Sequence, residues 1–133
     1  MNESIYKYFN VGTILWMSYP PATYGQSVEG YKDSLLKVLK DDYFNAIEIT
    51  QIKDDGLREE VKQLLDQSHM KVCYGAQPRL LSTGLNPNDL DEEGRLKAEK
   101  TLLEGIDEAE YLGAKGIAFL AGKWQEETKE HAY

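Results

Sequence analysis

Apolar residues gather in four short runs, and the segments between these runs mix apolar and polar residues with the period of a helix. The runs cover residues 9–17, 44–50, 70–76 and 116–121. Short, dense runs that are rich in β-branched residues are typical of buried strands. The pattern therefore predicts four strands.

Helical spacing defines three segments between these strands. Their apolar stripes are Val28, Tyr31, Leu35, Val38 and Leu39, then Leu57, Val61, Leu64 and Leu65, and then Ala98, Leu102, Ile106 and Ala109. Ser27 fits the N-cap of the first helix, and Asp54 or Asp55 fits that of the second. Asp89 and Glu92 have the spacing of a capping box for the third helix.

The remaining segments are polar or contain residues that end helices. Residues 77–91 are expected to form a long loop, because Pro and Gly interrupt them. His69 is expected to end the second helix, where a cation is favourable. Gly113 fits the position just after the third helix. The tail, residues 124–133, is expected to begin a fourth helix.

Alternating strands and helices predict an α/β fold with parallel strands in one domain, residues 1–133. Two architectures share this alternation, the open doubly wound sheet and the (βα)₈ barrel. Residues 18–25 follow the first strand and match neither the glycine-rich dinucleotide pattern nor the phosphate-binding loop. In the second strand, Ile47 and Ile49 share one face and Glu48 lies on the other, as expected near the mouth of a barrel.

We therefore expect the (βα)₄ half of a TIM-type barrel, which is incomplete as a single chain. Glu48 would point inward near the carboxyl end of its strand. Four small residues would face the narrow interior, namely Gly12, Ala46, Gly75 and Ala118.

Charge and cysteine content narrow the classes of partner. The chain has 15 basic and 23 acidic residues and a formal net charge of −8, which disfavours binding to nucleic-acid phosphates. A single cysteine excludes an internal disulfide and favours a reducing compartment, so we expect a cytoplasmic protein. No run is long enough to span a membrane, and the first residues do not have the pattern of a signal peptide.

Two segments carry a resemblance to a known family. Residues 109–117 (AEYLGAKGI) resemble the A-x-x-L-G-A-x-x-I segment before strand four of the sugar phosphate isomerase/epimerase family, the xylose-isomerase-like TIM barrels. Residues 44–49 (FNAIEI) are similar to that family's G-x-x-x-I-E-I strand, with Asn45-Ala46 where glycine is more usual. The resemblance spans residues 9–122 and corresponds to the N-terminal half of a barrel of about 250 residues.

The resemblance also implies a cofactor and a partner. Members of the family hold a divalent metal, Mn²⁺ or Mg²⁺, mostly with side chains from the later strands, so we assign no metal ligand in this chain. Four parallel strands leave two edges unpaired, which favours pairing with a second half-barrel or with a second copy of the chain.

Five residues are candidates for the site. Glu48 is the catalytic candidate, for proton transfer or for orienting a sugar hydroxyl. Trp16, Gln77, Arg79 and Trp124 are candidates for substrate binding, through aromatic stacking or through polar contacts. The structural alternative for Glu48 is a solvated or salt-bridged carboxylate at a strand end. For the tryptophans it is core packing, with an interface role as a third possibility for Trp124, and for Arg79 it is an ordinary surface position.

Three further residues are assigned lesser roles. Cys73 lies in the middle of a strand, and we expect an inert buried thiol. Tyr19 and Tyr24 follow the first strand, and they are either part of a lid or plain surface residues.

Three functions remain open. The first is a sugar or sugar-phosphate isomerase or epimerase that moves a proton next to a carbonyl with help from a metal, the chain being inactive alone. The second is a half-barrel that assembles or binds without catalysis. The third, a hydrolase of the endonuclease-IV type, is less favoured because Gln77 and Ala121-Gly122 stand near the places of that branch's histidines.

Overall fold

Four parallel strands form one sheet in the computed structural model, which describes residues 7–22, 27–122, 126 and 130. The strands are β1 (Gly12–Ile14), β2 (Ala46–Ile49), β3 (Lys71–Gly75) and β4 (Ile117–Ala118). They lie in the order β1-β2-β3-β4, and each described pair is parallel. The prediction of an α/β fold with parallel strands is confirmed, and the described order has no reversal of the doubly wound kind.

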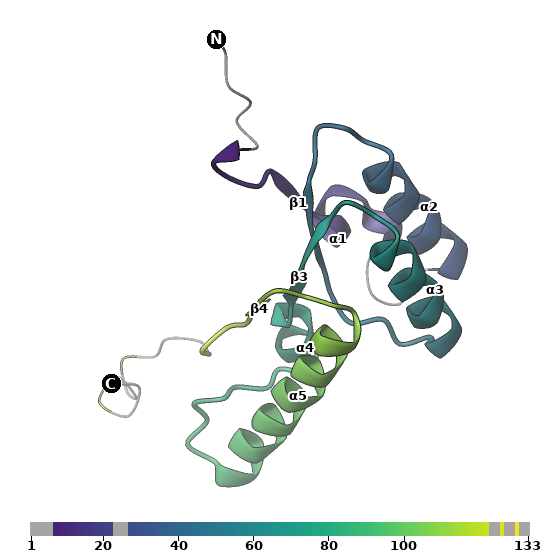
Figure 1. Ribbon diagram of the computed structural model, residues 1–133. Coiled ribbons are helices and arrows are strands. Elements are labelled where there is room, and N and C mark those ends of the chain that lie inside the picture. Colours follow the sequence, from purple (N-terminus) through teal and green to yellow (C-terminus); the bar gives the residue numbers. More distant parts are fainter. Residues whose placement is uncertain (1–6, 23–26, 123–125, 127–129, 131–133) are drawn as a thin grey trace.

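Helical segments connect the successive strands. They are α1 (Leu15–Ser18), the 3₁₀ turn η2 (Pro20–Ala22), α2 (Val28–Leu39), α3 (Asp55–Asp66), α4 (Gln77–Leu81) and α5 (Glu92–Tyr111). Figure 1 shows α2 and α3 side by side against the strands, with α4 and α5 toward the other end of the sheet. The predicted caps Ser27 and Asp54 are confirmed, because their side chains accept from the backbone N–H of Gly30 and Leu57 at 3.0 and 2.7 Å.

The two faces of the sheet differ in burial. Ile47, Ile49, Val72 and Tyr74 point toward the helices and belong to the hydrophobic core. The helices contribute Tyr31, Leu35, Val38, Val61, Leu65, Ala109 and Leu112 to the same core. Residues that alternate with the buried strand positions lie on the opposite face, and Gly12, Lys71, Cys73 and Ala118 are exposed there. The predicted alternation in β2 is thus confirmed, and we call the second surface the open face.

The first strand is shorter than predicted. Only Gly12–Ile14 pair with β2, and the chain then turns into α1, which buries Leu15. The backbone N–H of Tyr19 donates to the carbonyl of Leu15 at 2.9 Å. Pro20 follows directly, and proline cannot donate to a strand ladder. The apolar density of residues 9–17 therefore reflected a strand followed by a helical turn that buries Leu15.

The segment predicted as a loop begins with a helix. Residues 77–81 form α4, in which Pro78 occupies the first turn, where its missing N–H costs nothing. The cap of α5 is also different from the predicted one. Asp91 accepts from the N–H of Gly94 at 2.9 Å, whereas Asp89 accepts from the N–H of Asp91 at 3.0 Å. The predicted capping box is therefore wrong, and two successive aspartate turns lead into the helix.

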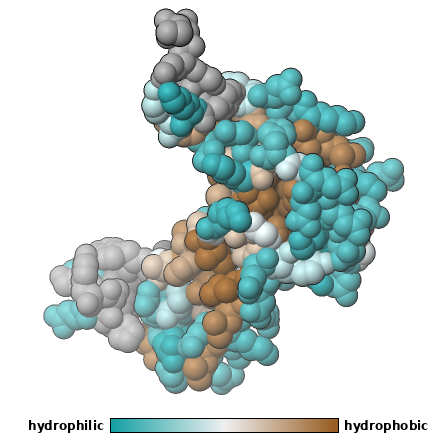
Figure 2. Space-filling model, viewed as in Figure 1, coloured by the Kyte–Doolittle hydropathy of each residue, from teal (hydrophilic) through white to brown (hydrophobic). Residues whose placement is uncertain are grey.

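The apolar stripe of α5 is shifted from the predicted one. Ala98 and Ala109 are buried as expected, but Ile106 is 47% exposed and Gly105 is buried in its place. The side chain of Arg79 lies against Gly105, with its Cδ 3.3 Å from where a Cβ would stand. Figure 2 shows apolar side chains gathered in the re-entrant middle of the molecule and along the region of α5.

The ends of two helices complete the comparison with the sequence. Gly113 follows α5 with φ at 74°, as the predicted C-terminal glycine requires. The second helix, α3, already ends at Asp66, so His69 does not cap it, and its Nε2 instead lies 3.1 Å from the carbonyl oxygen of Phe44. The predicted fourth helix falls mostly outside the described residues. No helix in the described part is long and apolar enough to cross a membrane.

Candidate functional site

Three side chains from three different elements meet above Gly75, the last residue of β3. Glu48 comes from β2, Trp16 from the helical turn after β1, and Gln77 from the first position of α4. Parallel strands bring their carboxyl ends to one edge, which explains why residues far apart in the sequence lie together. We call these three side chains the Glu48 cluster.

Gly75 makes this meeting possible because it has no side chain. A Cβ on Gly75 would lie 2.7 Å from Oε1 of Glu48 and 2.7 Å from Oε1 of Gln77, and the Trp16 ring would be closer still. These separations are too short for real atoms, so a side chain at position 75 would displace the three side chains from this arrangement. The hydroxyl of Thr50 donates to the carbonyl of Gly75 at 2.7 Å and fixes the strand end.

Two of the oxygen atoms in the cluster lack hydrogen-bond donors among the described residues. Oε1 of Glu48 and Oε1 of Gln77 are buried, and neither has a hydrogen-bond partner among the described residues. Burial raises the pKa of the Glu48 carboxyl above its ordinary value. Burying an acceptor without a hydrogen-bond donor costs folding free energy. A ligand that donated hydrogen bonds to these two oxygens would therefore remove this cost.

The open face continues from Glu48 as a shallow hollow. Its volume is about 390 Å³, and its lining includes Ile14, Ala46, Glu48, Lys71 and Cys73. Cys73 is exposed, so the expectation of a buried thiol is wrong. The reason is the strand register, which pairs Cys73 with Glu48 on the open face and turns Val72 and Tyr74 toward the helices.

Arg79 lies on the covered side of the sheet, away from the Glu48 cluster. Its side chain is only 6% exposed, so the alternative of an ordinary surface arginine is wrong. Its Nε donates to the Tyr74 hydroxyl at 2.8 Å, and its Nη2 donates to Oε2 of Glu108 at 2.6 Å. The structure therefore does not bring Arg79 together with the other candidates, and its role in substrate binding stays a prediction.

Glu108 is the centre of this second polar group, and the sequence analysis did not single it out. The Tyr74 hydroxyl donates to its Oε2 at 2.6 Å, and the backbone N–H of Ile52 donates to its Oε1 at 3.0 Å. Burial lowers the pKa of Arg79, but the bonds to Tyr74 and Glu108 outweigh burial and leave this pKa raised. In the sequence, this glutamate directly precedes Ala109 of the predicted apolar stripe, and that position could have indicated a buried carboxylate. We call Arg79, Tyr74 and Glu108 the Arg79 network.

The other aromatic candidates have different outcomes. Tyr19 packs against the hydrophobic core and is only partly exposed, so it is not a plain surface residue. Tyr24 and Trp124 lie outside the described residues, so their predicted roles stay predictions.

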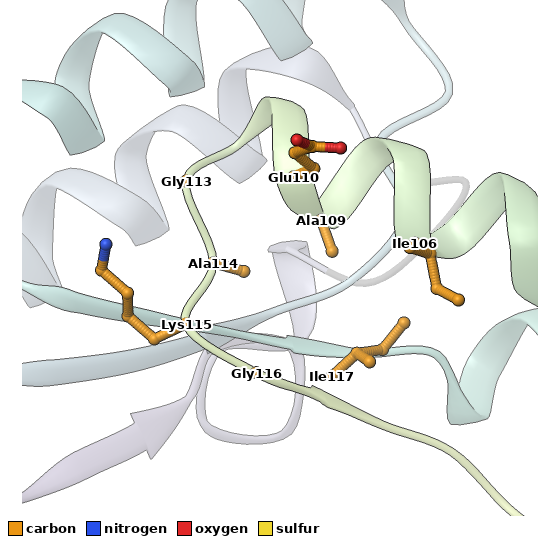
Figure 3. A pocket seen from close by; sticks show the side chains of 8 residues that line it. All are labelled: Ile106, Ala109, Glu110, Gly113, Ala114, Lys115, Gly116 and Ile117. Atoms are coloured by element: carbon orange, nitrogen blue, oxygen red, sulfur yellow. The ribbon is translucent and has the colours of Figure 1, made fainter.

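A groove of about 440 Å³ lies between the end of α5 and β4. Figure 3 shows Ile106, Ala109 and Ile117 pointing toward one another in this groove, while Glu110 points away from it. The groove presents mainly apolar side chains and backbone, and it lacks the converging polar groups that a catalytic site needs. We therefore place the candidate site at the Glu48 cluster.

The part of the chain that the structure describes contains no group of side chains suited to bind a metal ion. No three histidine, cysteine, aspartate or glutamate side chains lie close enough there to hold one together. The Glu48 cluster offers one carboxylate and one amide oxygen, which is fewer than the six ligands that Mg²⁺ and Mn²⁺ prefer.

Comparisons with known proteins add no family to these observations. The chain matches no family model, no curated protein and no solved structure.

Proposed function

We propose that this chain forms the N-terminal (βα)₄ half of a TIM-type barrel that isomerises or epimerises a sugar or sugar phosphate. The observation that carries the proposal is Glu48, whose carboxylate stands at the carboxyl end of β2, on the open face, with a buried oxygen that has no donor among the described residues. The sequential strand order supports the barrel, and so does the open face, on which Lys71, Cys73 and Ala118 are exposed, because the inner face of half a barrel is uncovered until the other half closes over it.

Glu48 is the proposed base and acid. Its carboxylate takes a proton from the carbon next to the substrate carbonyl, and the electron pair of that C–H bond moves toward the carbonyl oxygen to form an enediolate. In an isomerisation, the hydroxyl proton of the enediolate passes to the former carbonyl oxygen, and the resulting carboxyl returns its proton to the former carbonyl carbon. A raised pKa favours this role, because a carboxyl that holds its proton more tightly is a stronger base when ionised.

Two further side chains have proposed roles in this reaction, and no metal ion is assigned to it. Trp16 forms an apolar wall that excludes water, and Gln77 orients the substrate through its side-chain oxygen. The resemblance noted in the sequence implies a divalent metal, but the described residues do not fit one, and the step above is written without it.

The test measures exchange of carbon-bound hydrogen with solvent. The protein is purified as it is made in the cell, with any bound polypeptide, and incubated in D₂O with ketoses and ketose phosphates. We expect deuterium to enter at a carbon next to the carbonyl, and we expect Glu48→Gln to reduce this exchange by about 10²–10⁴-fold. Full exchange in Glu48→Gln would remove Glu48 from the mechanism, and no exchange with any substrate would overturn the proposal.

A second function, a half-barrel that assembles without catalysis, is favoured by one observation. The groove between α5 and β4 exposes apolar side chains, and Phe119 and Leu120 beyond β4 are also exposed. A second half-barrel would cover these residues and pair the free edges of β1 and β4. Light scattering tests this function, because it requires an assembly larger than the 15.1 kDa of one chain. The same assembly must show no exchange of carbon-bound hydrogen with solvent.

A further inference from the structure

The two edges of the sheet carry apolar side chains that the described chain leaves uncovered. β1 and β4 end the strand order, so each has one side without a neighbouring strand among the described residues. The groove beside β4 is lined by Ile106, Ala109 and Ile117, and Ile106 is 47% exposed. Before β1, Tyr8 and Phe9 are 65% and 60% exposed. One chain therefore carries an apolar hollow at one edge and exposed aromatic rings at the other.

The segment that carries Phe9 is anchored to the sheet. The backbone N–H of Val11 donates to Oδ1 of Asn45 at 2.7 Å, and the carbonyl of Val11 accepts from the N–H groups of Asn45 and Ala46 at 2.9 and 3.1 Å. Figure 1 shows the segment extending from β1 away from α2 and α3. Aromatic residues are enriched in interfaces, and a backbone that is already fixed loses little entropy on binding.

We propose that the groove binds Phe9 of a second copy of this chain, in a twofold pair in which β4 of each copy lies parallel to β1 of the other. This inference rests on the proposed function in that it treats the sheet as half of a barrel. Two copies supply the eight strands of a closed barrel. Because each contact occurs twice, no edge of the two sheets stays unpaired.

The strand register supports Phe9 as the occupant. Thr13 pairs with Ile47 on the covered side of the sheet, and Ile117 of β4 packs against the same core. Parallel neighbours align residues of one face, so Thr13 of one copy lies beside Ile117 of the other. Phe9 lies four residues before Thr13, and Gly113, which lines the groove, lies four residues before Ile117. Alternate residues of an extended chain share a face, which places Phe9 on the side of the groove.

The charged residues beside these two surfaces are complementary. Lys7 lies two residues before Phe9, Glu110 lines the groove, and both are exposed. Lys115, the other charged residue of the lining, also lines the hollow on the open face. Figure 3 shows Glu110 and Lys115 pointing away from the apolar side chains, which leaves these free to contact Phe9. An exposed pair of Lys7 and Glu110 adds little affinity but favours this orientation of the two copies.

The first experiment tests the contact by disulfide formation. Chains with Phe9→Cys and chains with Ile106→Cys, both also carrying Cys73→Ser, are mixed and oxidised. We expect a product of twice the 15.1 kDa chain mass that joins the two variants, and no cross-linking of either variant with itself. Leu96→Cys is the matched control, because Leu96 is 50% exposed on the same helix but does not line the groove. Ile106→Cys joined to itself would mean that β4 pairs with β4, and it would overturn the proposal.

The second experiment measures the dissociation constant of the pair by analytical ultracentrifugation. Phe9→Asp and Ile106→Asp should each raise it about 30-fold or more. Tyr43→Asp and Leu96→Asp should leave it nearly unchanged, because both residues are similarly exposed but lie away from the proposed contact. All four side chains are exposed in the single chain, so the circular dichroism spectrum should not change. A chain that stays monomeric, or equal effects of Phe9→Asp and Tyr43→Asp, would overturn the proposal.

Charge reversal and thiol labelling test the orientation and the closure of the pair. Lys7→Glu should raise the dissociation constant about threefold, and adding Glu110→Lys should restore it. Closure turns the open face of each copy inward. A disulfide reagent should therefore label Cys73 more slowly as the chain concentration rises. No restoration in the double variant, or a labelling rate that stays constant while the pair forms, would contradict this arrangement.

The two proposals fail separately. A cross-linked pair without solvent exchange in any ketose keeps this interface and refutes the proposed catalysis. Exchange that depends on Glu48 in a monomer, or in a complex with a different polypeptide, keeps the proposed function and refutes the second copy as the occupant.

Discussion

Two glutamates on opposite sides of one sheet have opposite surroundings. Glu108 lies on the covered side and accepts from Tyr74, Arg79 and the backbone of Ile52. Glu48 lies on the open face, and its buried oxygen has no donor among the described residues. Satisfied buried charges hold a fold together, whereas an unsatisfied acceptor is retained at a cost. The difference teaches that the covered side stabilises the molecule and that the open face is where a ligand is expected.

The largest expected effect is at Glu108. Glu108→Ala leaves the Arg79 guanidinium buried without its main counterion, so we expect the free energy of unfolding to fall by about 3–5 kcal/mol. Urea denaturation followed by circular dichroism measures this change. The control is Glu104→Gln, since Glu104 is 55% exposed and lies 3.9 Å from Arg79 Nη1. A loss as small for Glu108→Ala as for the control would show that the Arg79 network is not structural.

Tyr74→Phe tests the hydroxyl that lies between Arg79 and Glu108. The substitution keeps the buried ring and removes one donor and one acceptor, so we expect a loss of about 1–2 kcal/mol in the same denaturation experiment. Tyr111→Phe is the matched control, because its hydroxyl contacts Glu59 at an exposed site. An unchanged midpoint in Tyr74→Phe would contradict the role given to this hydroxyl.

Glu48→Gln tests the other side of the comparison through pH. The folded state raises the pKa of Glu48, so folding favours the protonated carboxyl. Its contribution to stability is therefore fully present below the ordinary pKa and is lost as pH rises through the raised value. We expect the melting temperature of Glu48→Gln, relative to that of the native chain, to increase as the pH rises from below the ordinary glutamate pKa to neutral, because glutamine keeps the uncharged form that folding favours.

Glu110→Gln controls for this pH effect, because it makes the same replacement at an exposed carboxylate. Identical pH profiles for the two variants would mean that the surroundings of Glu48 do not affect its ionisation.

The smallest expected effect on stability is at Cys73, where chemical labelling tests access to the open face. Its thiol is exposed, so we expect a disulfide reagent to label the folded chain in dilute solution at a rate close to that of the urea-unfolded chain, with no change in melting temperature. Strong protection of Cys73 would show that other polypeptide covers the open face in solution. The open face would then be an assembly surface rather than an accessible one.

The sequence predicted those parts of the fold that depend on local periodicity. The alternation of Ile47 and Ile49 with Glu48 correctly assigned the two faces of β2, and Ser27 and Asp54 correctly marked two helix starts. It did not predict α4, because proline usually interrupts helices, whereas Pro78 lies in the first turn of α4, where proline is tolerated.

Contacts between distant segments were harder to predict. Trp16, Glu48 and Gln77 were each identified as candidates, but their meeting above Gly75 depends on strand order and register. The Arg79 network was missed because a buried charge is recognised by its partner, and Glu108 lies 29 residues away from Arg79. Sequence spacing carries no information about such pairs, and Arg79 therefore looked like a surface residue.

The sequential order of the strands has a consequence for how such a protein can change in length. Each strand-and-helix unit touches mainly the units before and after it in the chain, so the sheet can gain or lose units at either end while its middle stays intact. Duplication of the coding sequence in tandem would add strands at an edge rather than disturb the interior. A fold built in this way is a natural starting point for growth by repetition.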